Sequence, residues 1–202
     1  MLDPTKITNF NATKSELEEM ILFWICAAGK NGVTAARSLD KLLLLSLHGS
    51  PFDKIIEIAK KSDLSQKMKS CGIGCYNRKA TTFLSLIDGK LNLKTCSVDD
   101  LEKISGIGPK TARCFLIHSR PNQQLAGLDT HILKFLRDQG LDVPKTTPTG
   151  KKYKEIEAMF LKYVKKSGMS VADFDLKVWN EYRSKQKNNL PNTEQNIYII
   201  CE

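Results

Sequence analysis

A glycine turn between two short helical segments is the feature that most constrains the fold of this chain. Ser97 opens an acid-rich stretch that is typical of a helix N-terminus, and Pro109 stands at the start of the next segment, where proline is best tolerated. A Gly-Ile-Gly turn lies between them at residues 106–108. Two glycines allow a tight turn whose N–H groups point outward at the positive end of the second helix. Residues 97–119 therefore predict a helical hairpin that holds a phosphate without reading bases.

The rest of the sequence predicts an all-α protein. Apolar residues recur at helical spacing between Gly, Asn and Pro breaks, and no alternating strand pattern of useful length appears. The first helix is expected to open with a capping box of Ser15 and Glu18. The apolar end at 197–201 is compatible with a strand, a docked extension or an unstructured end. Outside the hairpin, the expected helices cover residues 15–28, 33–47, 51–59, 65–71, 76–87, 128–136, 151–166 and 171–185.

Length and charge narrow the class of protein. A chain of 202 residues suffices for one domain or two small lobes that share a core. Thirty-one Lys and Arg residues against 22 Asp and Glu residues give a net charge of +9, which favours a polyanionic partner. Many soluble proteins are as basic, so charge alone is weak evidence for nucleic acid. The longest apolar run, residues 20–28, is far shorter than the roughly 20 residues needed to span a bilayer. We therefore expect no membrane partner.

The cysteines indicate a reducing compartment. Six of them are scattered through apolar or helical stretches, and the N-terminus lacks the apolar segment of a signal peptide. Cys71 and Cys75 form a C-x3-C pair without a second pair nearby, so no metal site is expected. The protein is expected to be intracellular, with reduced thiols.

Lys110 and Asp129 are the candidate reactive residues. Lys110 directly follows the turn, and Asp129 stands at the start of a later helix, where it could lie opposite the lysine amine. A phosphate clamp beside a lysine–aspartate pair indicates chemistry on DNA. Two simpler interpretations remain: a helix connector in a core, and a hairpin that binds DNA without catalysis. Asp129 is also a favoured N-cap residue, and both roles are expected to hold.

Two segments resemble the helix-hairpin-helix (HhH-GPD) DNA glycosylase superfamily, the group of endonuclease III and the 8-oxoguanine glycosylases. They are residues 101–112, with the Leu-x-x-Ile-x-Gly-Ile-Gly-Pro-Lys-Thr-Ala pattern, and residues 128–132, Leu-Asp-Thr-His-Ile. Residues 74–80 also resemble an endonuclease III segment, and the likeness runs from about residue 15 to 135. Only Cys201 follows Cys114, which excludes the four-cysteine iron–sulfur cluster of endonuclease III. The chain is therefore more similar to the compact 8-oxoguanine enzymes that lack a cluster.

The resemblance implies two helical lobes with a DNA-binding cleft between them. Residues 1–28 and 125–202 are expected to form one lobe and residues 29–124 the other, ending in the hairpin. The implied partner is double-stranded DNA with a damaged base, bound by a DNA-associated monomer. No cofactor is implied, apart from an optional monovalent cation at the hairpin.

The resemblance also implies roles for individual residues. Lys110 is expected to have a pKa lowered by burial, to attack the sugar C1′ and to form a Schiff base, from which β-elimination cleaves the strand. Asp129 is expected to accept a proton and to stabilise positive charge on the sugar. The expected contacts with the DNA backbone are Gly106, Ile107, Gly108, Lys110 and Thr111. The candidate wedges that fill the gap left by a flipped base are Lys30, Asn31, Ile73, Cys75 and Tyr76.

Aromatic and histidine side chains receive smaller roles. Trp179 is the candidate for the base pocket, whereas Trp24 and Phe23 are expected in the core. His131 is expected to have a structural role. The sequence thus predicts a bifunctional DNA glycosylase and AP lyase that excises an oxidised base, with 8-oxoguanine preferred and oxidised pyrimidines second. Two further hypotheses are a hairpin protein that only binds DNA and a base-modification enzyme on the same fold.

Overall fold

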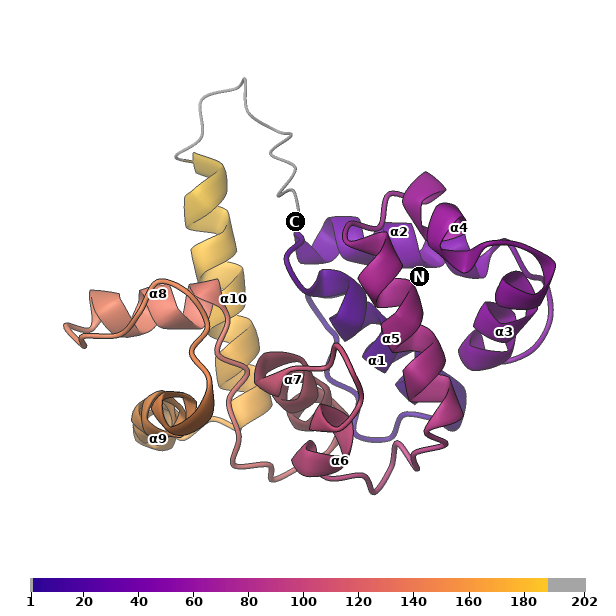
Figure 1. Ribbon diagram of the computed structural model, residues 1–202. Helices are drawn as coiled ribbons and strands as arrows, with labels where there is room; N and C mark the ends of the chain where they lie inside the picture. The colour runs from indigo at the N-terminus through magenta and orange to yellow at the C-terminus, as the bar shows by residue number, and fades with distance from the viewer. Residues whose placement is uncertain (1, 189–202) are drawn as a thin grey trace.

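The protein is all-α, as predicted. The structure, a computed structural model, describes residues 2–188, with side chains to residue 184; within that range it contains ten helices and no strand (Figure 1). The apolar segment 197–201 lies outside the described residues. The helices are α1 (Lys14–Ala27), α2 (Gly32–Leu43), α3 (Pro51–Lys61), α4 (Leu64–Ser70), α5 (Tyr76–Asp88), α6 (Val98–Glu102), α7 (Pro109–Ser119), α8 (Thr130–Asp138), α9 (Gly150–Ser167) and α10 (Val171–Asn188).

The first hydrophobic cluster surrounds α1. This helix packs against α2, α3, α5 and α7. Its consecutive residues 20–23 are all buried, so it presents apolar side chains in every direction and has to be surrounded. The expected division of the chain differs here, because residues 1–28 do not join the C-terminal lobe: the apolar side chains of α1 belong to the cluster formed by residues 7–116.

The second hydrophobic cluster unites α8, α9 and α10. Its buried residues run from Ile117 to Tyr182. The helix α10 packs against α8, α9 and α7. The helix α7 contributes residues to both clusters, since Phe115 and Leu116 belong to the first and Ile117 to the second. In Figure 1, α7 accordingly lies between α8–α10 on one side and α1–α5 on the other.

The N-terminal cap of α1 differs from the prediction. Thr13 and Glu16 form the capping box, with Glu16 N donating to Thr13 Oγ1 at 3.3 Å and Thr13 N donating to a Glu16 carboxylate oxygen at 2.7 Å. Glu18 is buried instead, and its carboxylate accepts the N–H of Phe52 at 3.1 Å. Glu18 therefore joins α1 to the start of α3, a long-range role that the local pattern does not reveal.

Two further details refine the sequence prediction. The helix α2 ends at Leu43, earlier than expected, and the leucines that follow at positions 44, 45 and 47 are exposed. Lys79, in the segment that resembles endonuclease III, is buried and donates to Cys26 O at 2.8 Å and Ala28 O at 2.9 Å. It thereby satisfies carbonyl groups at the C-terminal end of α1. Of the described helices, none has the length and apolar character required to cross a bilayer.

Candidate active site

A cavity of about 1000 Å³ opens beside the glycine turn. Its walls come from the N-terminal ends of α7 and α8, from the α1–α2 connection, and from α10. Because α1, α2 and most of α7 belong to the first cluster and α8 and α10 to the second, the cavity lies where the two clusters meet. Lys110 and Asp129 both line it.

The turn of the hairpin depends on its first glycine. Gly106 adopts a φ of +91°, in the left-handed region that glycine enters without cost. A Cβ at this position would lie 1.9 Å from Oγ1 of Thr82, so a side chain here would collide with α5. Ile107, between the two glycines, is buried and fixes the turn to the first cluster. The predicted tight turn is confirmed.

The start of α7 is suited to an anion. Gly108 is the N-cap and has no side chain to cap the helix, and Pro109 occupies the first helical position. The first-turn N–H groups are therefore not covered by a capping side chain, and the positive end of the helix dipole points the same way. Gly106 and Gly108 are exposed, whereas Thr111 is buried and lines the cavity.

Lys110 extends from this helix start over an aromatic ring. Its Nζ lies 4.7 Å from the ring centroid of Trp24. Burial lowers the pKa of this amine, but interactions with Cys114, Asp129 and Asp175 raise it, and the net direction is upward. The expected lowering of this pKa is therefore wrong: the Cys114 thiol and two acidic groups from outside α7 outweigh desolvation. The free protein holds Lys110 as an ammonium ion, which a cation–π contact also favours, so a reaction requires a proton acceptor.

Asp129 is the N-cap of α8, as predicted. Its Oδ1 accepts the N–H of His131 at 2.9 Å and the N–H of Ile132 at 2.9 Å. Burial raises the pKa of Asp129, and Asp175 raises it further, although Lys110 lowers it. A carboxylate whose pKa is raised accepts a proton more readily than an ordinary surface aspartate does.

A third acidic residue, Asp175 of α10, was missed in the sequence. It lines the cavity, is 6% exposed, and its Oδ2 lies 3.2 Å from Nε2 of His118. His118 is fully buried, and its Nδ1 lies 2.8 Å from Oγ1 of Thr8. The available signal was the position of Asp175 on the buried face of α10, in register with Val171 and Val178. Within the described residues, no group of three His, Cys, Asp or Glu side chains could hold a metal ion.

Two tryptophans line the cavity. Trp24 was expected in the core, but it is half-buried at the cavity wall. Its ring stacks on His118 with ring centroids 5.5 Å apart and an interplanar angle of 14°. Trp179 lines the cavity as well, with its ring edge-on to His131 at 6.2 Å. Phe23 is buried in the core, as expected. The start of α2 lies close to Trp179, since a Cβ on Gly32 would lie 3.1 Å from that ring.

The candidate wedge residues fall into two groups. Lys30 and Asn31 line the cavity, and Asn31 Oδ1 also caps α2 by accepting the N–H of Val33 at 3.0 Å. The others lie around the turn before α5. Ile73 is only 4% exposed and belongs to the first cluster, so the expectation that it inserts into DNA is wrong. Cys75 occupies the N-cap of α5 with a φ of +52°, and Tyr76 is half-buried.

The arrangement of helices matches that of two solved structures. One is the 8-oxoguanine DNA glycosylase of Thermotoga maritima, with 22% identity and a TM-score of 0.67 over 86% of this chain and 84% of that chain. The other is the 8-oxoguanine DNA glycosylase of Methanocaldococcus jannaschii, with 21% identity and a TM-score of 0.67 over 86% of this chain and 81% of that chain. At this level of identity, the likeness shows a shared fold.

Fold and motif together define a helix-hairpin-helix protein of the DNA glycosylase class. The profile of the 8-oxoguanine DNA glycosylase family matches residues 6–169, which is most of the chain, and the protein belongs to that family. It is therefore a DNA glycosylase of base excision repair with AP-lyase activity. The match extends past Leu136, where the sequence alone shows only compatible helical content.

Proposed function

We propose that this protein excises 8-oxoguanine from double-stranded DNA and cleaves the strand, with Lys110 as nucleophile and Asp129 as proton acceptor. One observation carries the proposal: these two residues, at the N-terminal ends of α7 and α8, line the same cavity beside a glycine turn suited to a phosphate. Family membership supports the substrate. The roles of the two side chains rest on their position and electrostatics.

The proposed reaction begins with a proton transfer. Since the Lys110 amine is charged in the free protein, it must lose a proton before it attacks, and Asp129 is the acceptor favoured by its raised pKa. The free amine then forms a bond to C1′ while the bond from C1′ to the base nitrogen breaks, and the leaving base takes up the proton that Asp129 accepted. As the sugar ring opens, a proton of the attached nitrogen passes to O4′ and a Schiff base forms between Nζ and C1′. A C2′ proton is then lost to water while the C3′–O bond breaks and the 3′ phosphate leaves, and hydrolysis of the Schiff base releases the lysine.

We propose that the DNA backbone binds at the hairpin. The exposed glycines of the turn and the N–H groups at the start of α7 contact phosphate, and the net charge of +9 attracts the duplex. These contacts are independent of base sequence. They hold the sugar of the damaged nucleotide close to Lys110 and leave recognition of the base to the cavity.

A flipped base is proposed to enter the cavity beside Trp179, because the ring of Trp24 is already in contact with His118 and Lys110. Stacking on an aromatic ring is worth roughly 1–3 kcal/mol per base. That amount offsets the few kcal/mol that unstacking a base requires. Lys30 and Asn31, which line the cavity, are candidates for filling the gap in the duplex, together with Cys75 and Tyr76 at the start of α5.

Duplexes that each carry a single lesion provide the test. The purified protein is incubated with DNA containing 8-oxoguanine, an oxidised pyrimidine, an abasic site or no lesion, and both free base and strand cleavage are measured. We expect release of 8-oxoguanine and nicking of the abasic duplex, with undamaged DNA intact. Preferential release of the pyrimidine would move the substrate to the second candidate. Binding without release or nicking would contradict the catalytic proposal.

The proposed assembly is one protein molecule on one duplex. A cavity formed by helices of a single chain contains both reactive residues, so the reaction needs no second copy. Light scattering of the protein with and without a short lesion duplex is expected to give the masses of a monomer and of a 1:1 complex. A stable dimer that remains on DNA would contradict this assignment.

A further inference from the structure

The segment that carries Asp129 has no regular structure of its own. Residues 120–129, called the strap below, connect α7 to α8. The backbone groups of Ala126 and Leu128 within it are held by side chains from elsewhere in the chain. Tyr153 Oη accepts the N–H of Leu128 at 3.0 Å and donates to Ala126 O at 2.7 Å, and Thr147 Oγ1 donates to Leu128 O at 2.8 Å. The last part of the strap, directly before Asp129, is therefore fixed by residues on and before α9.

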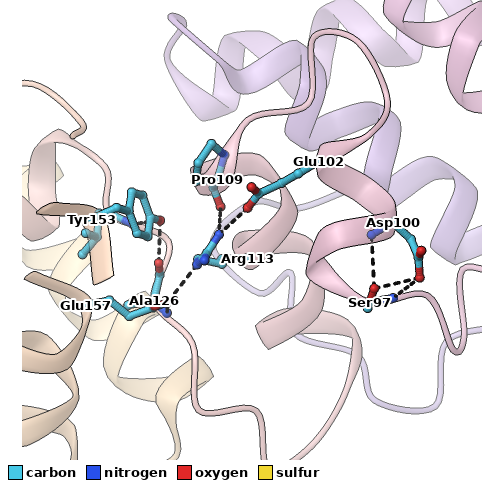
Figure 2. Close-up of polar contacts among 9 residues, drawn as sticks. Ser97, Asp100, Glu102, Pro109, Arg113, Ala126, Tyr153 and Glu157 are labelled. Carbon is cyan, nitrogen blue, oxygen red and sulfur yellow. Dashed lines mark hydrogen bonds and ion pairs between the residues drawn. The ribbon is translucent and has the colours of Figure 1, made fainter. Parts of the chain in front are cut away.

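A buried arginine connects this anchor to the hairpin. Arg113, one turn after Lys110 in α7, donates through Nε to Glu157 Oε1 at 2.9 Å and through Nη1 to Glu102 Oε1 at 2.5 Å (Figure 2). The same Glu157 oxygen accepts the N–H of Ala126 at 2.8 Å. One carboxylate oxygen of α9 thus contacts both the helix that carries Lys110 and the strap that carries Asp129.

Burial makes this network well defined. Arg113 is 7% exposed, Glu157 9% and Tyr153 1%. The guanidinium of Arg113 lies 4.6 Å from the ring centroid of Tyr153. Burial raises the pKa of Tyr153, so its hydroxyl keeps the proton that it donates to the strap. Since buried polar groups stay paired, these side chains have few alternative positions.

We propose that Arg113, Glu157 and Tyr153 are positioning residues that set the separation between the Lys110 amine and the Asp129 carboxylate. The inference rests on the proposed function and extends it to residues that line no part of the cavity. Reacting groups tolerate little displacement, since a misplacement of about 1 Å can cost roughly 100-fold in rate. The network acts on Lys110 through one turn of α7 and on Asp129 through three residues of the strap.

Tyr153→Phe is the first test. It removes the hydroxyl that holds the strap and keeps the ring beside Arg113. We expect the single-turnover rate of Schiff-base formation at saturating DNA to fall about 10-fold, with the Kd for DNA unchanged within a factor of two. The matched control is Tyr182→Phe, which removes a hydroxyl bonded to Asp138 at 2.9 Å in the same cluster, away from the strap. This control is expected to react like the wild type.

Glu157 provides a second test that separates positioning from stability. Glu157→Gln keeps an oxygen that accepts from Arg113 and Ala126, whereas Glu157→Ala leaves both donors without it. We expect the alanine variant to react at least 10-fold more slowly at saturating DNA and the glutamine variant to recover most of that loss. Rates are measured well below the Tm of each variant, so that a change in stability alone does not alter them.

The outcomes are distinct. Slower single-turnover rates with unchanged DNA affinity, together with recovery in the glutamine variant, support the inference. Wild-type rates in Tyr153→Phe and Glu157→Ala overturn it and leave the proposed function intact. A parallel loss of affinity and rate that glutamine does not restore also overturns it, because it indicates a purely structural role. Failure of the wild-type protein to form a Schiff base overturns both the proposed function and the inference.

Discussion

The hairpin that carries Lys110 and the strap that carries Asp129 reach the same cavity in different ways. The hairpin is specified locally: Ser97 caps α6, glycine allows the turn, and Pro109 opens α7. In the strap only Asp129, the cap of α8, is a local signal, and the residues before it are held by hydrogen bonds with Tyr153 and Glu157 of α9. The position of the hairpin is thus specified by residues within it, whereas the position of the strap also depends on residues that lie about 25 to 30 positions away in the chain.

The largest predicted effect removes the contribution of the hairpin. Lys110→Gln deletes the nucleophile, and we expect borohydride trapping on an 8-oxoguanine duplex to fall by about 1000-fold or more. Covalent adducts on a denaturing gel measure this directly. Lys103→Gln is the matched control, because it removes a positive charge from the same hairpin at the exposed end of α6. An adduct of wild-type intensity in Lys110→Gln would show that another amine attacks.

The second effect removes the contribution of the strap. Asp129→Asn keeps an oxygen for the cap of α8 and loses the carboxylate, so base excision is expected to fall about 100- to 10,000-fold while stability is retained. Asp129→Ala loses both and is expected to be destabilised by a further 1 kcal/mol or so. Excision rates and urea unfolding distinguish the two variants. Equal rates in Asp129→Asn and the wild type would leave Asp129 only its capping role.

The same substitution also gives a pH dependence. The Asp129 carboxylate raises the pKa of Lys110, so its removal lowers that pKa, although Asp175 and Cys114 remain beside the amine. A lower pKa leaves more uncharged amine at a given pH. On abasic DNA, where no base has to leave, the rise of Schiff-base formation with pH is therefore expected at lower pH in Asp129→Asn. A shift to higher pH would contradict the interaction.

This contrast explains what the sequence could predict. The hairpin, the helix caps at Ser97 and Asp129, and the all-α class follow from local spacing, and each was predicted correctly. The surroundings of Lys110 were not predictable in this way. Asp175 approaches from α10, and only the packing of that helix on α7 and α8 brings it to the amine. For that reason the direction of the lysine pKa was wrong in the sequence prediction.

The surroundings of the aromatic and wedge residues were likewise not predictable from local spacing. Trp24 lies in an apolar run that predicts a core helix, and the structure still leaves it half-buried at the cavity. Ile73 lies in a glycine-flanked turn that resembles a surface loop, yet it is buried. Helical spacing predicts which residues share a face of a helix. Whether that face is buried or exposed at a cavity depends on which other elements pack against it, and helical spacing does not give this.

A third prediction tests how far the hairpin depends on its turn. Gly106→Ala places an alanine at a position with a left-handed backbone conformation. Its Cβ would collide with Thr82, so the turn has to move. We expect the affinity for lesion DNA to fall about 10-fold, or about 1.4 kcal/mol, in fluorescence anisotropy. Gly140→Ala is the control, since Gly140 has a φ of +82° and nothing lies within 4 Å of its Cβ position. Both variants carry the backbone cost of about 1 kcal/mol, and only the first should weaken binding.

The smallest effect concerns the cap of α6. Ser97→Ala removes the hydroxyl that accepts the N–H of Asp100 at 3.1 Å and donates to its carboxylate at 2.7 Å, and we expect a loss of about 1 kcal/mol in the free energy of unfolding. Catalysis should not change, because the glycine turn and α7 remain in place. Ser70→Ala, whose hydroxyl donates only within its own helix to Lys67 O, is the control.

The pH dependence of stability tests this cap independently. Hydrogen bonds from the backbone and side chain of Ser97 lower the pKa of Asp100. A carboxyl with a lowered folded-state pKa stabilises the protein above the ordinary aspartate value of about 3.9, and this stabilisation is lost as the pH falls through the folded value. Ser97→Ala keeps the hydrogen bond from the backbone N–H to the Asp100 carboxylate and loses the one from the hydroxyl. The free energy of unfolding of the variant should therefore decline less than that of the wild type between roughly pH 5 and pH 3, the window set by these pKa values. An identical decline in both proteins would show that the hairpin owes its position to the packing of α7 against α1 and α10 and not to its local cap, which would remove the main difference between the hairpin and the strap.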